Sequence, residues 1–157
     1  MADHKYSVVI TDTSCFIILD KIDLIDLLPV LFNNIITTHQ IAKEYGKPLP
    51  DWVIIQSVAD FALQNDLLNI VDPGEASAIA LAEEIGCDYL LTDDKAARKI
   101  AEQRGITVKG SIGLLLFAKQ QGLIPLIKPY LEKIQNTNFR ISYALIAKIL
   151  AQADESV

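Results

Sequence analysis

The sequence predicts an α/β protein with three layers, α/β/α, a parallel sheet of about five strands and a C-terminal helical cap. Short runs of β-branched residues alternate with helical segments along the chain, and this alternation is typical of a parallel sheet covered by helices on both faces. The 157 residues, 51% of them hydrophobic, suit one domain with a sizeable core. No internal repeat or Ser/Gly-rich linker divides them. We therefore expect a single domain over residues 1–157, with a core over about 7–122 and C-terminal helices over about 123–153.

In the first half of the chain, apolar runs bounded by turn residues predict the elements. Ser7–Thr11 is a β-branched run that stops at the polar turn Asp12-Thr-Ser14, as a buried strand does. Trp52–Gln56 fits either a strand or a helix. The other expected elements are a strand over Ile35–Thr38 and helices over Cys15–Asp20, Asp23–Phe32, His39–Tyr45 and Ala59–Asn65.

In the second half, the turn Asp72–Glu75 leads into an Ala-rich helix over Ala76–Ile85, which ends at Gly86. The remaining expected elements are strands over Tyr89–Thr92 and Ile106–Lys109, and helices over Lys95–Arg104, Gly110–Gln121, Ile127–Gln135 and Ser142–Ala153.

Charge is divided unevenly along the chain. Residues 1–92 hold 4 Lys and Arg against 14 Asp and Glu, a net charge of −10, and residues 93–157 hold 10 against 6, a net charge of +4. The overall charge of −6 argues against nucleic acid as a partner. The division nevertheless suits an acidic, cation-binding centre beside a basic surface that holds a polyanion. Ordinary solvated helix faces are the alternative.

Several features indicate a soluble, cytoplasmic protein without a membrane partner. Met1–Ser7 lacks the apolar segment of a signal peptide. The longest uninterrupted apolar or Gly stretch, Ile112–Ala118, is far shorter than the roughly 20 residues that span a bilayer. Cys15 and Cys87 are too few for a disulfide framework.

Acidic side chains stand at the ends of the predicted elements. They are Asp12, Glu44, Glu75, Asp93 and Asp94. Ligands of an open parallel sheet bind beyond the carboxyl ends of its strands, so we expect the acids that follow strands to meet there. Crowded carboxylates repel one another unless a cation neutralises them. Oxygen ligands suit Mg²⁺ or Mn²⁺, whereas His4 and His39 lack the spacing of zinc ligands.

Each acid taken alone also has an ordinary structural explanation. Asp12 and one of Asp93 and Asp94 fit helix N-caps. Glu75 in a first turn complements the helix dipole, and Glu44 fits an exposed helix position. Only the five together indicate a metal site.

Four segments resemble the four motifs of PIN-domain nucleases, in the same order. Val8–Ser14 is a hydrophobic strand ending in Asp-x-Ser, and His39–Glu44 ends in a glutamate. Gly74–Ala82 is an acid followed by an Ala-rich helix, and Leu90–Asp94 is a strand ending in Thr-x-Asp. The last two are most similar to a prokaryotic branch related to VapC-type toxins.

The resemblance implies a PIN-like fold and an endoribonuclease that hydrolyses single-stranded RNA by metal-activated water with Mg²⁺ or Mn²⁺, as the toxin of a toxin-antitoxin pair. Carried over by position, the catalytic residues are Asp12, Glu44, Glu75 and Asp94, with Ser14 assisting the metal-bound water. The metal ligands are Asp12, Glu75 and Asp94, with Asp93 as an additional acid.

Substrate and partner contacts are predicted from two other features. Lys95, Arg98 and Lys109 follow the fourth acid closely and suit RNA phosphates, although solvated helix charges are the alternative. The first predicted helices carry more apolar residues than one domain is expected to bury, which predicts a homodimer. These residues are Phe16, Ile17, Ile18, Leu24, Leu27, Leu28, Leu31 and Phe32.

Two other function classes compete with the nuclease. One is a catalytically silent PIN-like module that binds RNA or a protein partner. The other is a receiver-like, phosphoryl-accepting domain, which also uses carboxylates at strand ends and a lysine such as Lys109. A receiver needs an acid pair after the first strand, and here Thr13 follows Asp12.

Overall fold

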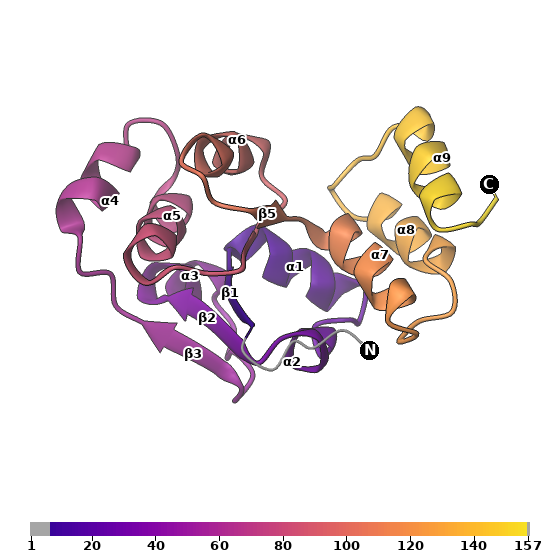
Figure 1. Cartoon of the computed structure of the whole chain (residues 1–157), viewed down its shortest axis with the longest axis horizontal. Helices are drawn as coiled ribbons and strands as arrows, with labels where there is room; N and C mark the ends of the chain where they lie inside the picture. Colours follow the sequence, from indigo (N-terminus) through magenta and orange to yellow (C-terminus); the bar gives the residue numbers. More distant parts are fainter. Residues whose placement is uncertain (1–6, 157) are drawn as a thin grey trace.

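The computed structural model describes residues 7–156, so predictions that concern Met1–Tyr6, including His4, and Val157 lie outside the described residues. Its five strands form one all-parallel sheet in the order β3-β2-β1-β4-β5 (Figure 1). The strands are β1 (Val8–Thr11), β2 (Asn34–Thr38), β3 (Val53–Gln56), β4 (Tyr89–Leu91) and β5 (Val108–Lys109). The segment Trp52–Gln56, which fitted either a strand or a helix, contains the edge strand β3.

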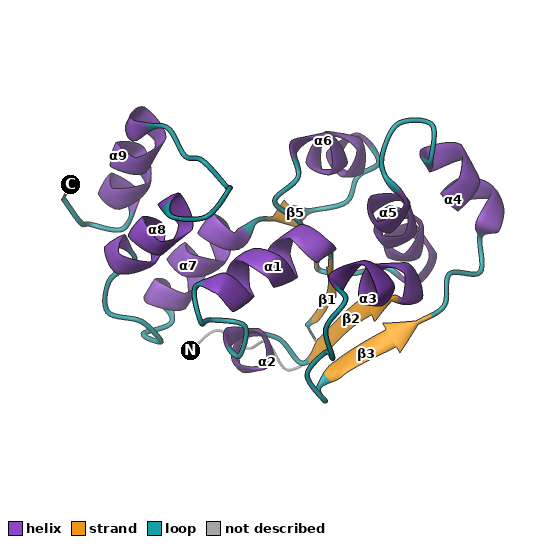
Figure 2. Ribbon diagram, turned by 180° about the vertical axis from the view of Figure 1, so that it is seen from behind, coloured by secondary structure: helices purple, strands orange, loops and turns teal. Residues whose placement is uncertain are grey.

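Nine helices lie within residues 7–156 (Figure 2). They are α1 (Thr13–Lys21), α2 (Leu27–Leu31), α3 (His39–Tyr45), α4 (Phe61–Leu67), α5 (Pro73–Ile85), α6 (Lys95–Gln103), α7 (Ser111–Gln120), α8 (Lys128–Gln135) and α9 (Tyr143–Gln152). Among these residues, none of the helices is both long and apolar enough to cross a bilayer.

The helices cover the sheet in two layers, which confirms the predicted three-layer fold. Helix α5 packs on β2, β1 and β4 and contacts α4 and α6, whereas α1 contacts α3, α7 and α8. Crossovers between parallel strands are right-handed. The chain steps from β1 through β2 to β3 in one direction along the sheet, and from β4 to β5 in the opposite direction. The helices that connect β1, β2 and β3 therefore lie on one face of the sheet, and α6, which connects β4 to β5, lies on the other.

The pairing of β1 with β4 brings distant parts of the chain together. Ile10 is in register with Leu90, and the Asp12 N–H donates to the Leu91 carbonyl oxygen (2.9 Å). Because the two strands are parallel, the residues that follow them lie side by side at the carboxyl edge of the sheet. Asp12 and Asp94, which follow these two strands, lie at this edge.

The helix predicted over Asp23–Phe32 is wrong in its first half. Asp23 has a positive φ of 61°, which interrupts a right-handed helical path, and α2 begins only at Leu27. Pro29 then falls in the first turn of α2, where its missing N–H leaves no helical hydrogen bond unmade.

The apolar residues of the first two helices are largely covered within the chain itself. Phe16, Ile18, Leu28 and Phe32 are at most 6% exposed, while Ile17 is 39% exposed. Helices α7 and α8 supply the cover over α1. This packing removes the main reason for expecting a homodimer, which stays a prediction.

Glu155 fixes the C-terminal helices to one another. Its carboxylate accepts hydrogen bonds from the Lys119 ammonium (2.9 Å) and from the Ile127 and Lys128 N–H groups (2.8 and 3.1 Å). The segment after α9 is thereby attached to α7 and to the start of α8. Together with the buried Ile149 and Leu150 of α9, this attachment positions α9 against the body of the protein.

Candidate active site

Asp12 lies directly after β1, where the neighbouring strand β4 also ends. It is 3% exposed, and its Oδ1 accepts a hydrogen bond from the Thr13 N–H (2.8 Å) and its Oδ2 from the Thr92 hydroxyl (2.8 Å). Burial raises the pKa of Asp12 to about 6, and the charges of Asp72 and Asp94 add to the rise, while the two hydrogen bonds oppose it. Asp12 therefore both caps α1 and faces other acids.

Glu75 and Asp94 form a pair of carboxyl groups beside Asp12. Glu75 is 8% exposed, and the Asp94 carboxyl group lies close enough to affect its ionisation. Burial is the main reason why the pKa of Glu75 is raised to about 8, and the neighbouring Asp94 carboxyl group and the charges of Asp72 and Asp94 add to the rise. Asp94 also caps α6, since its Oδ2 accepts from the Ala97 N–H (2.8 Å).

Asp72 is a site residue that the sequence reasoning missed, because it was assigned only to a turn. It is the N-cap of α5: its Oδ1 accepts from the Glu75 N–H (2.9 Å), and Glu75 Oε1 accepts from the Asp72 N–H (3.1 Å). This capping box places both carboxylates at one helix start. The Asp-x-x-Glu spacing before the Ala-rich helix was the available signal. We call Asp12, Asp72, Glu75 and Asp94 the acidic cluster.

Glu44 comes from α3 and lies at the border of the acidic cluster. Its Oε1 accepts from the Thr13 hydroxyl (3.1 Å) and its Oε2 from the Gln40 amide (3.2 Å). A Cβ atom at Gly74 would lie 2.1 Å from Glu44 Oε1, so any other residue there would displace this carboxylate. The glycine therefore lets the Glu44 carboxylate lie against the start of α5.

Two buried hydroxyl groups hold the start of α5 against α3. Ser77 donates to the Gly74 carbonyl oxygen (2.7 Å), and the Thr38 and Ser77 hydroxyls are 2.7 Å apart. Because Ser77 uses its proton on Gly74, Thr38 is the donor to Ser77. This chain of hydrogen bonds fixes Glu44 relative to the acidic cluster.

Asp93 faces away from the acidic cluster, unlike its neighbour Asp94. Its Oδ1 accepts from the Ser111 N–H (2.8 Å) and its Oδ2 from the Ser111 hydroxyl (2.6 Å). Burial raises the pKa of Asp93, while the Ser111 hydrogen bonds and the Arg98 charge oppose the rise. A Cβ atom at Gly110 would lie 2.8 Å from Asp93 Oδ1. The geometry thus does not support Asp93 as a metal ligand; it attaches the β4–α6 loop to α7.

Thr92 and Ser14 connect the two strand ends. The Thr92 hydroxyl donates to Asp12, accepts from the Asp94 N–H (3.2 Å) and lies 3.3 Å from Ser14 Oγ. Ser14 Oγ in turn accepts from the Asp93 N–H (3.0 Å). Since the Thr92 proton is used on Asp12, Ser14 keeps its own proton for Thr92 or for a ligand.

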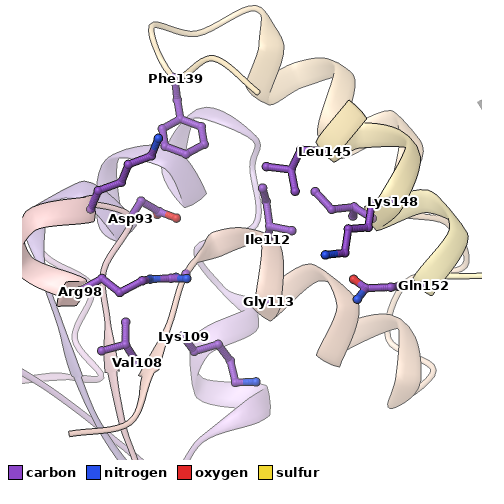
Figure 3. A pocket seen from close by; sticks show the side chains of 13 residues that line it. Asp93, Arg98, Val108, Lys109, Ile112, Gly113, Phe139, Leu145, Lys148 and Gln152 are labelled. Carbon is purple, nitrogen blue, oxygen red and sulfur yellow. The ribbon is translucent and has the colours of Figure 1, made fainter. Parts of the chain in front are cut away.

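The predicted substrate-binding cations line a cleft of about 490 Å³ beside the acidic cluster (Figure 3). Lys95 and Arg98 are exposed on α6. The Lys109 ammonium instead lies over the rings of Tyr89 and Phe117, 4.8 and 5.4 Å from their centroids, and burial lowers the pKa of Lys109. Lys95 and Arg98 are therefore placed to meet a ligand, and the Lys109 ammonium faces aromatic rings.

The acidic cluster suits a hard divalent cation by its chemistry. All its donors are carboxylate oxygens, which Mg²⁺ and Mn²⁺ prefer. As the side chains lie, no three His, Cys, Asp or Glu residues within 7–156 have the spacing of a formed metal centre. The donor set therefore fits such a cation by its chemistry, while its present geometry is not that of a formed centre.

A parallel α/β/α sheet with acids gathered at its carboxyl edge is the architecture that the four sequence motifs predicted. A family model described as a PIN domain matches residues 8–155. The chain therefore belongs to the PIN-domain family, which confirms the resemblance and excludes the receiver-like alternative. PIN domains are generally nucleases. No curated protein matches the chain, and the relation to VapC-type toxins stays a prediction.

Proposed function

We propose that the protein is an endoribonuclease that hydrolyses single-stranded RNA with Mg²⁺ or Mn²⁺. One observation carries the proposal: carboxylates from three distant segments meet at one edge of the sheet, and the pKa values of Asp12 and Glu75 are raised to about 6 and about 8. Such crowding destabilises the fold unless positive charge compensates for it. A divalent cation on a phosphodiester substrate supplies that charge.

The reaction that fits is attack of a water oxygen on phosphorus with cleavage of the P–O3′ bond, which leaves a 5′-phosphate and a 3′-hydroxyl. When bound, the cation would stabilise charge on the phosphoryl oxygens and make the attacking water more acidic. Asp12, Glu75 and Asp94 would hold it. Glu44, fixed by Thr13 and Gly74, would orient the attacking water.

Ser14 has a defined part in this proposal. Its oxygen accepts from the Asp93 N–H, and its own O–H can turn from Thr92 to donate to a phosphate oxygen or to water. A hydroxyl held by the backbone in this way stabilises developing negative charge without reorganising. Ser14→Ala should therefore lower the cleavage rate more than it lowers RNA affinity.

Cleavage of labelled single-stranded RNA with Mn²⁺ tests the proposal. We expect Asp12→Asn and Asp94→Asn to lose at least about 100-fold in rate, because each removes a cation ligand. Asp66→Asn makes the same chemical change at an exposed position of α4 and should leave the rate unchanged. Cleavage that survives both cluster substitutions, or no cleavage by the wild type under conditions where it binds RNA, would leave only the silent RNA-binding module.

We also propose, from the motif resemblance, that the nuclease acts as the toxin of a toxin-antitoxin pair. Gly74–Ala82 and Leu90–Asp94 carry that resemblance. Induced expression should then arrest growth in a way that Asp94→Asn prevents, and a neighbouring gene should encode a small antitoxin that restores growth. The expected homodimer is tested separately by sedimentation of the purified protein.

A further inference from the structure

The cleft beside the acidic cluster is formed between α6 and the last helix, α9. Lys95 and Arg98 line one side, and Lys148 from the middle of α9 lines the other. Lys95 and Lys148 form no ion pair within residues 7–156. Among the lining residues the only acid is Asp93, whose two oxygens accept from Ser111. The cleft therefore carries net positive charge.

This cleft adjoins the candidate active site. A second hollow of about 440 Å³ is lined by Ser14 and Asp94 and extends to the α8–α9 connection. The two hollows share Asp93 and Phe139 in their walls. Phe139 and Asp93 therefore stand between the hollow at Asp94 and the basic cleft under α9.

The side chains in the cleft are arranged as a backbone-binding groove. Figure 3 shows Arg98 and Lys148 pointing into it from opposite walls, with Ile112 and Leu145 between them and Phe139 at the end nearest Asp93. Phe139 is half-buried, so one part of the ring packs on the protein and the rest stays accessible. Cations spaced along a groove with an aromatic ring at one end are typical of single-strand binding sites.

We propose that the cleft between α6 and α9 holds the single strand of RNA on one side of the cleaved phosphate, with Lys95, Arg98 and Lys148 on successive phosphates and Phe139 stacked on a base. The identity of the ligand as RNA rests on the proposed function. A duplex does not fit this proposal, because its paired bases are not free to stack on a side chain. The C-terminal helices thus act as one wall of the substrate channel.

Binding without cleavage tests this proposal independently of catalysis. A fluorescein-labelled oligouridine is titrated with protein in EDTA, and anisotropy is measured from 0.05 to 0.5 M salt. For a single strand, each neutralised phosphate contributes about −0.7 to the slope of log K against log salt. We therefore expect Lys148→Gln to reduce that slope by about 0.7 and to weaken binding about fivefold at 0.1 M salt. Lys133→Gln removes the same charge from α8 outside the cleft and should change neither the salt slope nor the affinity.

Phe139→Leu tests the stacking contact, since leucine keeps an apolar contact with the core. We expect it to weaken binding about 5-fold to 100-fold with the salt slope unchanged. Circular dichroism and thermal melting show that each variant is folded. Equal affinity and slope for wild type and Lys148→Gln, or tighter binding of duplex than of single strand, would overturn the proposal. Wild-type binding of this kind without Mn²⁺-dependent cleavage would support the cleft and refute the proposed nuclease.

Discussion

Replacing Glu75 by Gln removes a negative charge from the most crowded part of the acidic cluster. The folded-state pKa of Glu75 is about 8 against an ordinary value of 4.5, so the folded protein binds more protons than the unfolded chain between these values. Its stability must therefore fall as pH rises from about 4.5 to about 8. Glutamine keeps the acceptor for the Asp72 N–H and stays uncharged at every pH. The loss of stability that Glu75 causes between about pH 4.5 and about pH 8 should therefore disappear.

The size of the effect follows from the shift in proton affinity. At about 1.4 kcal/mol for each tenfold change, a rise in pKa from 4.5 to about 8 sets an upper bound of about 5 kcal/mol. Water at the open side of the cluster and relaxation of the pair with Asp94 screen a large part of this. We expect Glu75→Gln to stabilise the metal-free protein by about 2 kcal/mol at pH 8, which is about 4–8 °C in Tm for a chain of this size.

Thermal melting in EDTA at pH 5 and pH 8 measures the effect. The wild type should lose stability between the two pH values, and Glu75→Gln should lose much less. Glu102→Gln, an exposed change on α6, controls for net charge. Added Mn²⁺ should raise the Tm of the wild type at pH 8 more than that of Glu75→Gln, through preferential binding to the folded state. A Glu75→Gln protein that is no more stable than the wild type at pH 8 would refute this account of the cluster.

Three further substitutions test the surrounding structure. Gly74→Ala should displace the Glu44 carboxylate, because the new Cβ would lie 2.1 Å from Oε1, and should lower the RNA cleavage rate about 10-fold to 100-fold, measured beside a melt that shows the variant is folded. Ser111→Ala removes one of the two hydrogen bonds that Ser111 donates to half-buried Asp93 and should cost about 1–3 kcal/mol in urea unfolding; an unchanged midpoint would show that Asp93 is not held as described. Glu155→Gln weakens the attachment of the C-terminal helices and should cost a similar amount, with faster amide exchange in α9 than in the sheet.

The layered fold could be predicted because its strands are short apolar runs that end at polar residues. Val8–Thr11 and Tyr89–Leu91 both have this form, and each is followed by a helix whose cap is the acid itself. The break before α2 could not be predicted, because apolar spacing over residues 23–32 carries no sign that Asp23 adopts a left-handed conformation. The left-handed backbone of Asp23 therefore ends the helical path, and α2 begins only at Leu27.

The candidate site was predictable only in part. The placement of Asp12 and Asp94 at the same edge follows from their places after parallel strands, whatever the strand order, and they meet because β1 and β4 are neighbours. Which member of the Asp93 and Asp94 pair faces the cluster could not be predicted, because Ser111, 18 residues further along the chain, binds Asp93. Phe139, in the α8–α9 connection, and Lys148, on α9, enter the site region only through the packing of the C-terminal helices, a long-range arrangement that local sequence does not encode.

The hydrogen bond between Thr92 and Asp12 joins residues separated by 80 positions, and this has a consequence for protein synthesis. While a ribosome is still making the first half of the chain, Asp12 has neither the β4 strand beside it nor the partners that complete its surroundings. A nascent or prematurely terminated product that lacks Asp94 cannot assemble the centre. The activity that we propose can thus arise only after most of the polypeptide has emerged.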